Sequence, residues 1–359
     1  MSSIITFLGK GGSGRTTVAI AVAKKLADDG AKVLIIGQDS SPAWWLQLEA
    51  AAATGITEIA PNLSALQIQA TALLEQNWEQ IKELEKQYLR TPLLKNVYGQ
   101  ELGILPGMDQ ALALNVLREQ DKSGKFDFIV YDGTGELNTL RALGIPEVGS
   151  WYIRRFRQVF ADSEIVRNLS PFVQPITSAI LNVSWSFDDL GKNEATDILE
   201  EGRKALKNPH RVVAYLVSND DPASIATAKY FWGGAQQIGL SVAGVFLNGS
   251  ANASQDFSPL KVINIPRKTG GDWQALIDAL PNLRNPNDVP PPLTIDASTR
   301  SVKVYLPGFD KKAVKLTQSG PELTIEAGNQ RRNIKVPPAL AGQSVKGAKF
   351  QDGYLIISF

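Results

Sequence analysis

The sequence contains no cysteine and only one histidine, His210, among its 359 residues. Without cysteine the chain can form no disulfide, no thiolate metal site, no iron–sulfur cluster and no cysteine nucleophile. A single histidine beside a proline fits a loop position better than zinc ligation or a catalytic triad. Only two methionines are present, which excludes a methionine-rich adaptable binding surface.

Long apolar runs and an excess of charge are missing as well. No run of about eighteen uncharged apolar residues occurs, so we expect no stable membrane insertion. The N-terminal residues MSSIITFL lead directly into a glycine-rich loop, so we expect no cleaved signal peptide and a cytoplasmic location. The formal net charge is +1, which provides no general attraction for nucleic acid.

The first part of the chain alternates apolar β-branched segments with helical patterns, which predicts an α/β fold with a parallel sheet and helices on both faces. The expected strands are residues 4–8, 32–36, 126–131, 212–217 and 242–247. Residues 16–28 predict the first helix, and apolar residues at helical spacing predict an amphipathic helix near 63–90. Residues from about 150 to 206 favour a helical subdomain inserted into this α/β domain.

A proline-rich stretch marks the predicted domain boundary. Residues 285–292 read NPNDVPPP, and such proline density favours a stiff, extended connector. The residues after it show short segments of period-two alternation separated by turn residues, which predicts a small all-β sandwich. We therefore expect an α/β domain over 1–284, a linker over 285–292 and the sandwich over 293–359.

The stretch GKGGSGRTT, residues 9–17, has the spacing of a phosphate-binding P-loop but holds Arg15 where the usual lysine stands. It follows a predicted strand and opens a predicted helix, so backbone N–H groups and the helix dipole converge there. The alternative is a glycine-rich turn without a ligand. The candidate nucleotide-binding residues are Gly9, Lys10, Gly11, Gly12, Ser13, Gly14, Arg15, Thr16 and Thr17.

Two aspartates support this site. Asp39 follows the second predicted strand, and Asp132 ends the strand FDFIVYD. In a parallel sheet both are expected at the carboxyl edge, beside the P-loop. There, together with the Thr16 hydroxyl, they are candidates to hold Mg²⁺ or its water shell, or to orient an attacking water. Taken singly, each aspartate could equally be a turn or helix-cap residue.

Several segments resemble the ArsA/Get group of SIMIBI-class ATPases, which includes the arsenite-pump and tail-anchored-protein-targeting ATPases. GKGGSGRTT is similar to their deviant Walker A motif, and IIGQDSSPA to their switch I segment, although two serines separate Asp39 from Pro42. FDFIVYDGTGELNTLRALGIP and LPGMDQALAL are similar to two further family segments. AGVFLNGS resembles the segment whose asparagine recognises adenine, which assigns that role to Asn248.

The resemblance implies an Mg²⁺-ATP-binding homodimer in which Lys10 reaches the partner's phosphates and Asp39 positions the hydrolytic water. The bottom-up alternative for Lys10 is a solvated loop lysine. The family further implies that nucleotide state controls a groove for hydrophobic protein clients, as in a targeting factor or chaperone. Aromatic residues across 150–190 could line such a groove, although packing inside the helical subdomain explains most of them equally well. In this family arsenite pumping and the zinc staple between subunits depend on cysteine, so we expect neither in this cysteine-free chain.

The C-terminal segments resemble the α-crystallin (small heat-shock) fold, and ArsA-type ATPases of photosynthetic organisms carry such a fusion. The family signature is matched by Ala348, Gly353 and Leu355 in AKFQDGYLIISF, with Asp352 at its asparagine position. The role of this module is left open between docking on the ATPase domain and client contact.

Arg15 shapes the functional interpretation. A planar guanidinium keeps the charge of lysine but is bulkier and binds through a fixed fork. We therefore expect Lys10, Arg15 and Asp39 to be the catalytic residues of a slow ATPase. The alternative is a nucleotide-gated holdase or scaffold with little or no hydrolysis.

Overall fold

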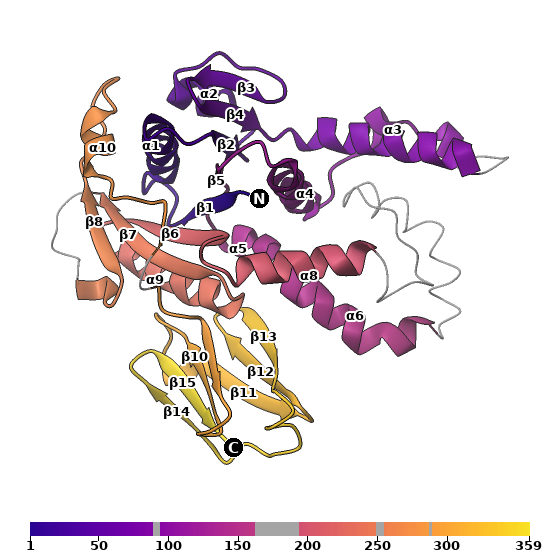
Figure 1. The fold of residues 1–359 in the computed structure, drawn as a ribbon, viewed down its shortest axis with the longest axis vertical. Helices are drawn as coiled ribbons and strands as arrows, with labels where there is room; N and C mark the ends of the chain where they lie inside the picture. Colours follow the sequence, from indigo (N-terminus) through magenta and orange to yellow (C-terminus); the bar gives the residue numbers. More distant parts are fainter. Residues whose placement is uncertain (89–93, 162–193, 249–254, 287–288) are drawn as a thin grey trace.

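The computed structural model describes residues 1–88, 94–161, 194–248, 255–286 and 289–359. Its first part is an α/β domain around an eight-stranded sheet (Figure 1), as the sequence predicts. The strand order is β3-β4-β2-β5-β1-β6-β7-β8, parallel throughout except for the pair β3 and β4. The strands are β1 (Ser3–Leu8), β2 (Val33–Gly37), β3 (Thr57–Ala60), β4 (Leu63–Gln67), β5 (Phe128–Asp132), β6 (Val212–Asn219), β7 (Ser241–Asn248) and β8 (Lys261–Ile265).

Helices connect these strands and cover the sheet. They are α1 (Arg15–Asp28), α2 (Pro42–Leu48), α3 (Ala70–Tyr88), α4 (Met108–Ser123), α5 (Leu137–Leu143), α6 (Ile145–Ala161), α8 (Glu194–Leu206), α9 (Pro222–Gln237) and α10 (Gln274–Ala279). Short 3₁₀ turns occur at Leu94–Asn96, Gly99–Glu101 and Lys311–Ala313.

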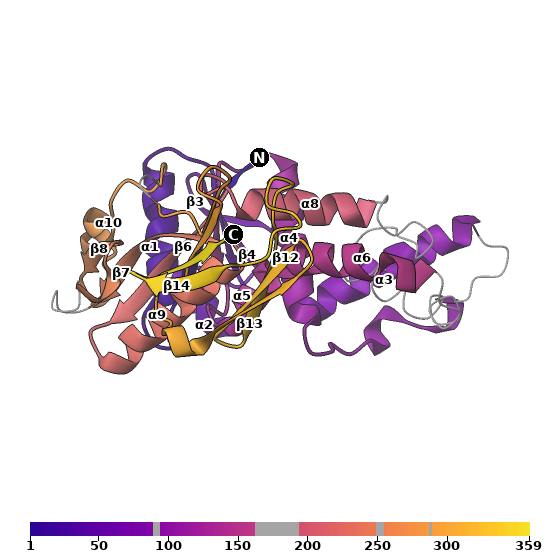
Figure 2. The same cartoon turned by 90° about the horizontal axis from the view of Figure 1, so that it is seen from below.

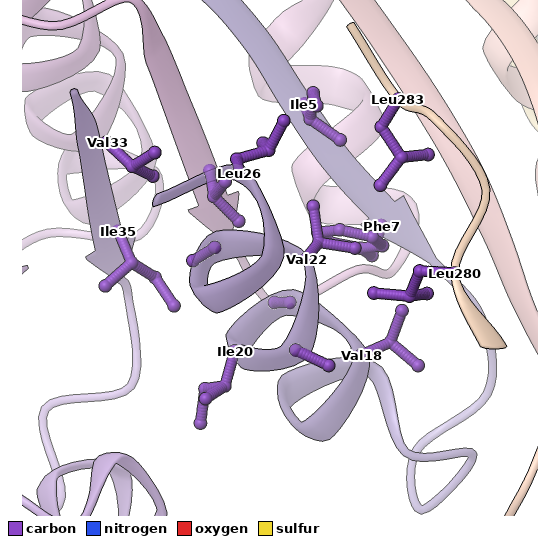
Figure 3. Packing of buried hydrophobic residues seen from close by; sticks show 14 of the residues in the cluster. Ile5, Phe7, Val18, Ile20, Val22, Leu26, Val33, Ile35, Leu280 and Leu283 are labelled. Atoms are coloured by element: carbon purple, nitrogen blue, oxygen red, sulfur yellow. The ribbon is translucent and has the colours of Figure 1, made fainter. Parts of the chain in front are cut away.

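The central helix α1 buries one face against the sheet. Alanine, valine and leucine recur along it at helical spacing, and Val18, Val22 and Leu26 are almost fully buried. They pack against Phe7 of β1 and Leu280 near the end of α10 (Figure 3). Because these contacts come from segments far apart in the sequence, they fix the start of α1, and with it the glycine-rich loop, on the sheet.

The predicted helix near residues 63–90 is wrong at its start. Residues 63–67 form β4, which pairs in parallel with β2, and α3 begins only at Ala70. Leu63, Ala65 and Gln67 are buried while the residues between them are half-buried, which is the alternation of a strand. Continued helical spacing from Leu66 onward concealed this short strand in the sequence.

The predicted helical subdomain is represented by α6 and α8, which pack against each other. Together with α3 they extend to one side of the molecule, away from the sheet (Figures 1 and 2). Residues 162–193, which hold three of the aromatic side chains considered for a client groove (Phe172, Trp185 and Phe187), lie outside the described residues. Among the described residues, no helix is long and apolar enough to cross a membrane.

The C-terminal part is all-β, as predicted. A four-stranded sheet has the order β14-β15-β10-β9 and a three-stranded sheet the order β11-β12-β13, and one apolar core joins them. Its strands are β9 (Leu293–Asp296), β10 (Ser301–Tyr305), β11 (Val314–Ser319), β12 (Glu322–Ala327), β13 (Gln330–Lys335), β14 (Gly347–Gln351) and β15 (Tyr354–Ser358). The proposed domain boundaries at 284/285 and 292/293 stay predictions.

Aromatic contacts dock this β domain beneath α9 (Figure 1). Phe309 packs edge-on against Tyr230 of α9, with 5.7 Å between ring centroids, and Tyr305 meets Trp232 in the same way at 5.6 Å. Gly233 of α9 leaves room for Phe309 and Pro307 of the β domain, since a Cβ at Gly233 would lie 2.4 Å from both Phe309 Cε2 and the Pro307 carbonyl oxygen. The two domains are therefore in close van der Waals contact.

Charged groups extend the same interface. Arg332 of β13 is 4% exposed, and its Nη1 donates to the carbonyl oxygens of Gln236 and Pro292 at 2.8 and 3.3 Å. Burial lowers the pKa of Arg332 to about 10, so the guanidinium stays charged at neutral pH. On α6, Arg154 Nη2 lies 2.7 Å from one oxygen of Glu322.

Candidate nucleotide site

The loop between β1 and α1 has the conformation of an anion cradle. Gly12 and Gly14 have φ angles of 78° and 93°, in the region that glycine adopts most easily. The Ser13 N–H donates to the Lys10 carbonyl at 3.1 Å, which closes the loop. A Cβ at Gly11 or Gly12 would meet nothing within 4 Å, so this side of the loop is open. Helix α1 starts at once afterwards, placing its free N–H groups at the loop.

Gly9 holds the loop against the neighbouring strand. A Cβ at this residue would lie 2.1 Å from the Val217 carbonyl oxygen on β6, closer than real atoms approach. The Gly9 N–H donates to the Gly135 carbonyl at 3.2 Å. The glycine-rich loop is thus fixed between β6 and the loop at residues 133–136, which follows β5.

The side chain of Arg15 is directed at the loop 133–136. Its Nη1 donates to the Thr134 carbonyl oxygen, and its guanidinium covers Gly135. Burial lowers the pKa of Arg15, whereas the nearby charges of Asp132 and Glu136 raise it. The arginine therefore links the P-loop to the segment after β5, and the sequence alone did not indicate this direction.

Asp132 is the buried carboxylate of the site. It ends β5 opposite Gly37 of β2 and is 5% exposed. Burial raises the pKa of Asp132 to about 6. Hydrogen bonds from Thr16 and Trp44 and the charge of Arg15 oppose this rise, while the charge of Asp39 adds to it. The structure thus brings Thr16, Arg15 and both aspartates together at the carboxyl edge of the sheet.

We expect Asp132→Asn to stabilise the ligand-free protein near neutral pH. The folded-state pKa lies above the ordinary value of 3.8, so the folded state holds this proton more tightly than the unfolded state does. The ionised Asp132 side chain therefore lowers the free energy of unfolding. This lowering is complete above a pH of about 6, partial between about 4 and 6, and absent below about 4. A shift of two pKa units corresponds to about 3 kcal/mol, which is the gain in free energy of unfolding expected from removing the buried charge. Part of this gain is offset, because the amide oxygen of the variant accepts hydrogen bonds more weakly than the carboxylate. Denaturant unfolding of both proteins should show a difference at about pH 7 that shrinks towards pH 4, and an equal difference at both would contradict the burial account.

Asp39 is exposed, and its carboxylate has local partners. Its two oxygens accept from the Ser41 backbone N–H and the Ser41 hydroxyl at 2.8 and 2.9 Å. Ser41 is one of the two serines that separate Asp39 from Pro42. Ser41 therefore caps the carboxylate, just before α2 begins.

Sequence reasoning missed two residues that lie beside these aspartates. Trp44 of α2 is fully buried, and its Nε1–H donates to Asp132 Oδ2 at 3.1 Å. Gln67 ends β4, and its Nε2 donates to the carbonyl oxygens of Asp39 and Ser41 at 2.7 and 2.9 Å. Recognition of β4 as a strand would have placed Gln67 at the carboxyl edge, because that is where parallel strands present polar residues.

Two buried polar atoms near the loop have no partner among the described residues. They are the Ser13 hydroxyl and the Asn248 carbonyl oxygen Oδ1. Asn248 ends β7, and its Nδ2 would lie 3.0 Å from a Cβ on Gly14. Buried polar atoms usually find a hydrogen-bond partner, so these groups fit a polar ligand that lies in the loop.

The remaining predicted residues are Lys10 and Thr17. Lys10 is exposed. A hydrogen bond from the Ser224 N–H holds the pKa of Asp221 low, and the charge of Lys10 contributes, which places the lysine towards the start of α9. Thr17 is half-buried in the first turn of α1. The structure places all the predicted residues at one edge of the sheet, while their roles stay predictions.

The comparisons with known proteins agree with this geometry. A family model described as anion-transporting ATPase matches residues 2–263, and one described as the HSP20-like domain found in ArsA matches residues 297–359. The chain is 26% identical over 392 residues to a protein of Prosthecochloris vibrioformis provisionally named an arsenical pump-driving ATPase, covering 99% of this chain and 95% of that protein. It is 31% identical over 209 residues to ATPase get3 of Schizosaccharomyces japonicus, covering 56% and 60%.

Proposed function

The chain belongs to the ArsA family of anion-transporting ATPases, with an ArsA HSP20-like domain after the ATPase domain, and we propose that it binds and slowly hydrolyses Mg²⁺-ATP at the loop 9–17. One observation carries the proposal. An open glycine cradle at the start of α1 lies beside two aspartates at the ends of neighbouring strands. This is the arrangement that phosphoryl-transfer sites of the P-loop class use.

The proposed roles follow from these positions. The backbone N–H groups from Gly9 to Thr17 hold phosphates, aided by the charges of Lys10 and Arg15. Thr16 offers its hydroxyl to Mg²⁺, with Asp132 in the outer shell of the metal. When bound, the metal supplies charge neutralisation of the phosphate oxygens. Asp39 orients the attacking water, and Asn248 hydrogen-bonds the adenine ring.

We also infer a homodimer. Lys10 is exposed, which fits a lysine that reaches the phosphates of a second subunit. The nucleotide would then lie between two chains and control their approach. Hydrophobic protein segments are the proposed clients, as the resemblance to the tail-anchored-protein-targeting ATPases implies. The alternative is a holdase or scaffold in which nucleotide binding, without turnover, sets the conformation.

Steady-state ATP turnover by the wild type and by Asp39→Asn tests the enzymatic part. The carboxylate is expected to contribute as a water-positioning or basic group, so its loss should slow turnover by about 100-fold or more. ATP binding should change little, because the amide keeps the shape and one oxygen. No turnover in the wild type would favour the holdase, and equal turnover in the variant would remove Asp39 from the reaction.

Arg15→Lys is expected to increase turnover. The fork of Arg15 is engaged by Thr134 and crowds Gly135, whereas an ammonium is compact and can approach a transferring phosphoryl group more closely. We expect an increase of about threefold to tenfold, equivalent to roughly 1 kcal/mol of barrier. Arg15→Gln, which removes the charge, is the control and should weaken ATP binding. Turnover that is unchanged in Arg15→Lys would show that the arginine does not limit the reaction.

A further inference from the structure

Trp44 joins the segment after Asp39 to the buried carboxylate Asp132. Its indole is fully buried, and Nε1–H donates to Asp132 Oδ2 at 3.1 Å. Thr16 also hydrogen-bonds to this carboxylate. Asp132 is therefore held from two sides, by the first turn of α1 and by α2.

The backbone of β2 is shaped to admit this indole. A Cβ on Gly37 would lie 2.1 Å from Trp44 Cε2 and 2.5 Å from Nε1. Gly37 ends β2 directly opposite Asp132 on β5. The indole edge thus rests on the glycine backbone, and the absent side chain at Gly37 is what lets the N–H reach the carboxylate.

The next residue anchors the same helix at a second point. Trp45 Nε1–H donates to Gln67 Oε1 at 2.7 Å, and Gln67 in turn holds the carbonyl oxygens of Asp39 and Ser41. Hydrogen bonds therefore link the Asp39 backbone through Gln67 to Trp45, and the peptide bond between Trp44 and Trp45 joins them to the separate hydrogen bond at Asp132. Two neighbouring indoles secure the segment at two different polar residues.

We propose that Trp44 is a positioning residue that orients Asp132 for Mg²⁺ and ties the metal side of the site to the Asp39 segment. This inference rests on the proposed function. A carboxylate with one oxygen held by an indole N–H presents its other oxygen in a fixed direction. Hydrogen bonds to a charged acceptor are about twice as strong as neutral ones, so Trp44 limits the rotation of Asp132. Outer-shell partners of this kind tune metal affinity.

The test compares Trp44→Phe with Trp45→Phe by calorimetric titration of ADP in the presence and absence of Mg²⁺. Trp44→Phe keeps an aromatic ring in the pocket but removes the donor to Asp132. We expect the Mg²⁺-dependent gain in ADP affinity to fall about fivefold to tenfold, with metal-free ADP affinity within about twofold of the wild type. Trp45→Phe removes the donor to Gln67 alone and should keep the full Mg²⁺ dependence.

The outcomes separate this inference from the proposed function. A wild type that binds no nucleotide would overturn the proposed function itself. A wild type with Mg²⁺-dependent binding and a Trp44→Phe variant with the same dependence would overturn the role of Trp44 alone. An equal loss in both tryptophan variants would indicate packing of α2 and would also overturn it. Should Trp44→Phe fold poorly, Gly37→Ala, which displaces the indole by overlap, is expected to show the same loss.

Discussion

Replacing Gly9 with alanine is expected to abolish tight nucleotide binding and to destabilise the fold. The added Cβ would lie 2.1 Å from the Val217 carbonyl oxygen, and neither backbone can yield without moving the loop or β6. Overpacking of this kind costs about 1 to 3 kcal/mol or more. A shift of about 1 Å in the cradle can cost about 100-fold in function. Denaturant unfolding and titration with ATP measure the two effects.

Gly11→Ala is the matched control. It adds the same methyl group to the same loop, but nothing lies within 4 Å of its Cβ, so unfolding should stay within about 0.5 kcal/mol of the wild type. Equal stability of the two variants would contradict the packing account of Gly9. Undiminished ATP binding by Gly9→Ala would show that nucleotide binds elsewhere.

Gly233→Ala is expected to loosen the β domain from the ATPase domain. In an exposed helix this change would stabilise by up to about 1 kcal/mol. Here the Cβ would overlap the Pro307 carbonyl oxygen and the Phe309 ring, each at 2.4 Å. The net effect is expected to be a loss of about 2 kcal/mol, with faster hydrogen exchange in the facing segments of α9 and β13.

Gly347→Ala in β14 controls for the substitution itself. A Cβ at Gly347 meets nothing within 4 Å, so exchange in α9 and stability should resemble the wild type. Exchange that is unchanged in Gly233→Ala would show that the contact between Phe309 and α9 does not hold the domains together.

Local patterns predicted most of the fold. The glycine loop between a strand and a helix is encoded within a few residues, because phosphate cradles need glycine where φ is positive, as at Gly12 and Gly14. The carboxyl-edge rule placed Asp39 and Asp132 at one edge of the sheet without knowledge of their contacts, whereas Asn248 was identified only through the family resemblance. The change in periodicity after the proline-rich stretch was sufficient to predict a separate all-β domain.

Contacts between distant segments could not be predicted in this way. The hydrogen bond from Trp44 to Asp132 joins residues 88 positions apart, and nothing in the pattern SSPAWWLQL specifies its partner. The direction of Arg15 depends on the loop 133–136, more than a hundred residues away. The close fit of Phe309 against Gly233 likewise depends on how two domains dock, and neither residue is distinctive in the sequence.

Calorimetric titration of the wild-type protein with ATP, in the presence of Mg²⁺, tests the central claim most directly. We predict saturable binding of one ATP per chain, strengthened by Mg²⁺ and lost in Gly9→Ala, because the cradle, Thr16 and Asp132 act on the same ligand. Absence of saturable binding by the wild type, or binding that Gly9→Ala leaves unchanged, would contradict the assignment of the loop 9–17 as the nucleotide site.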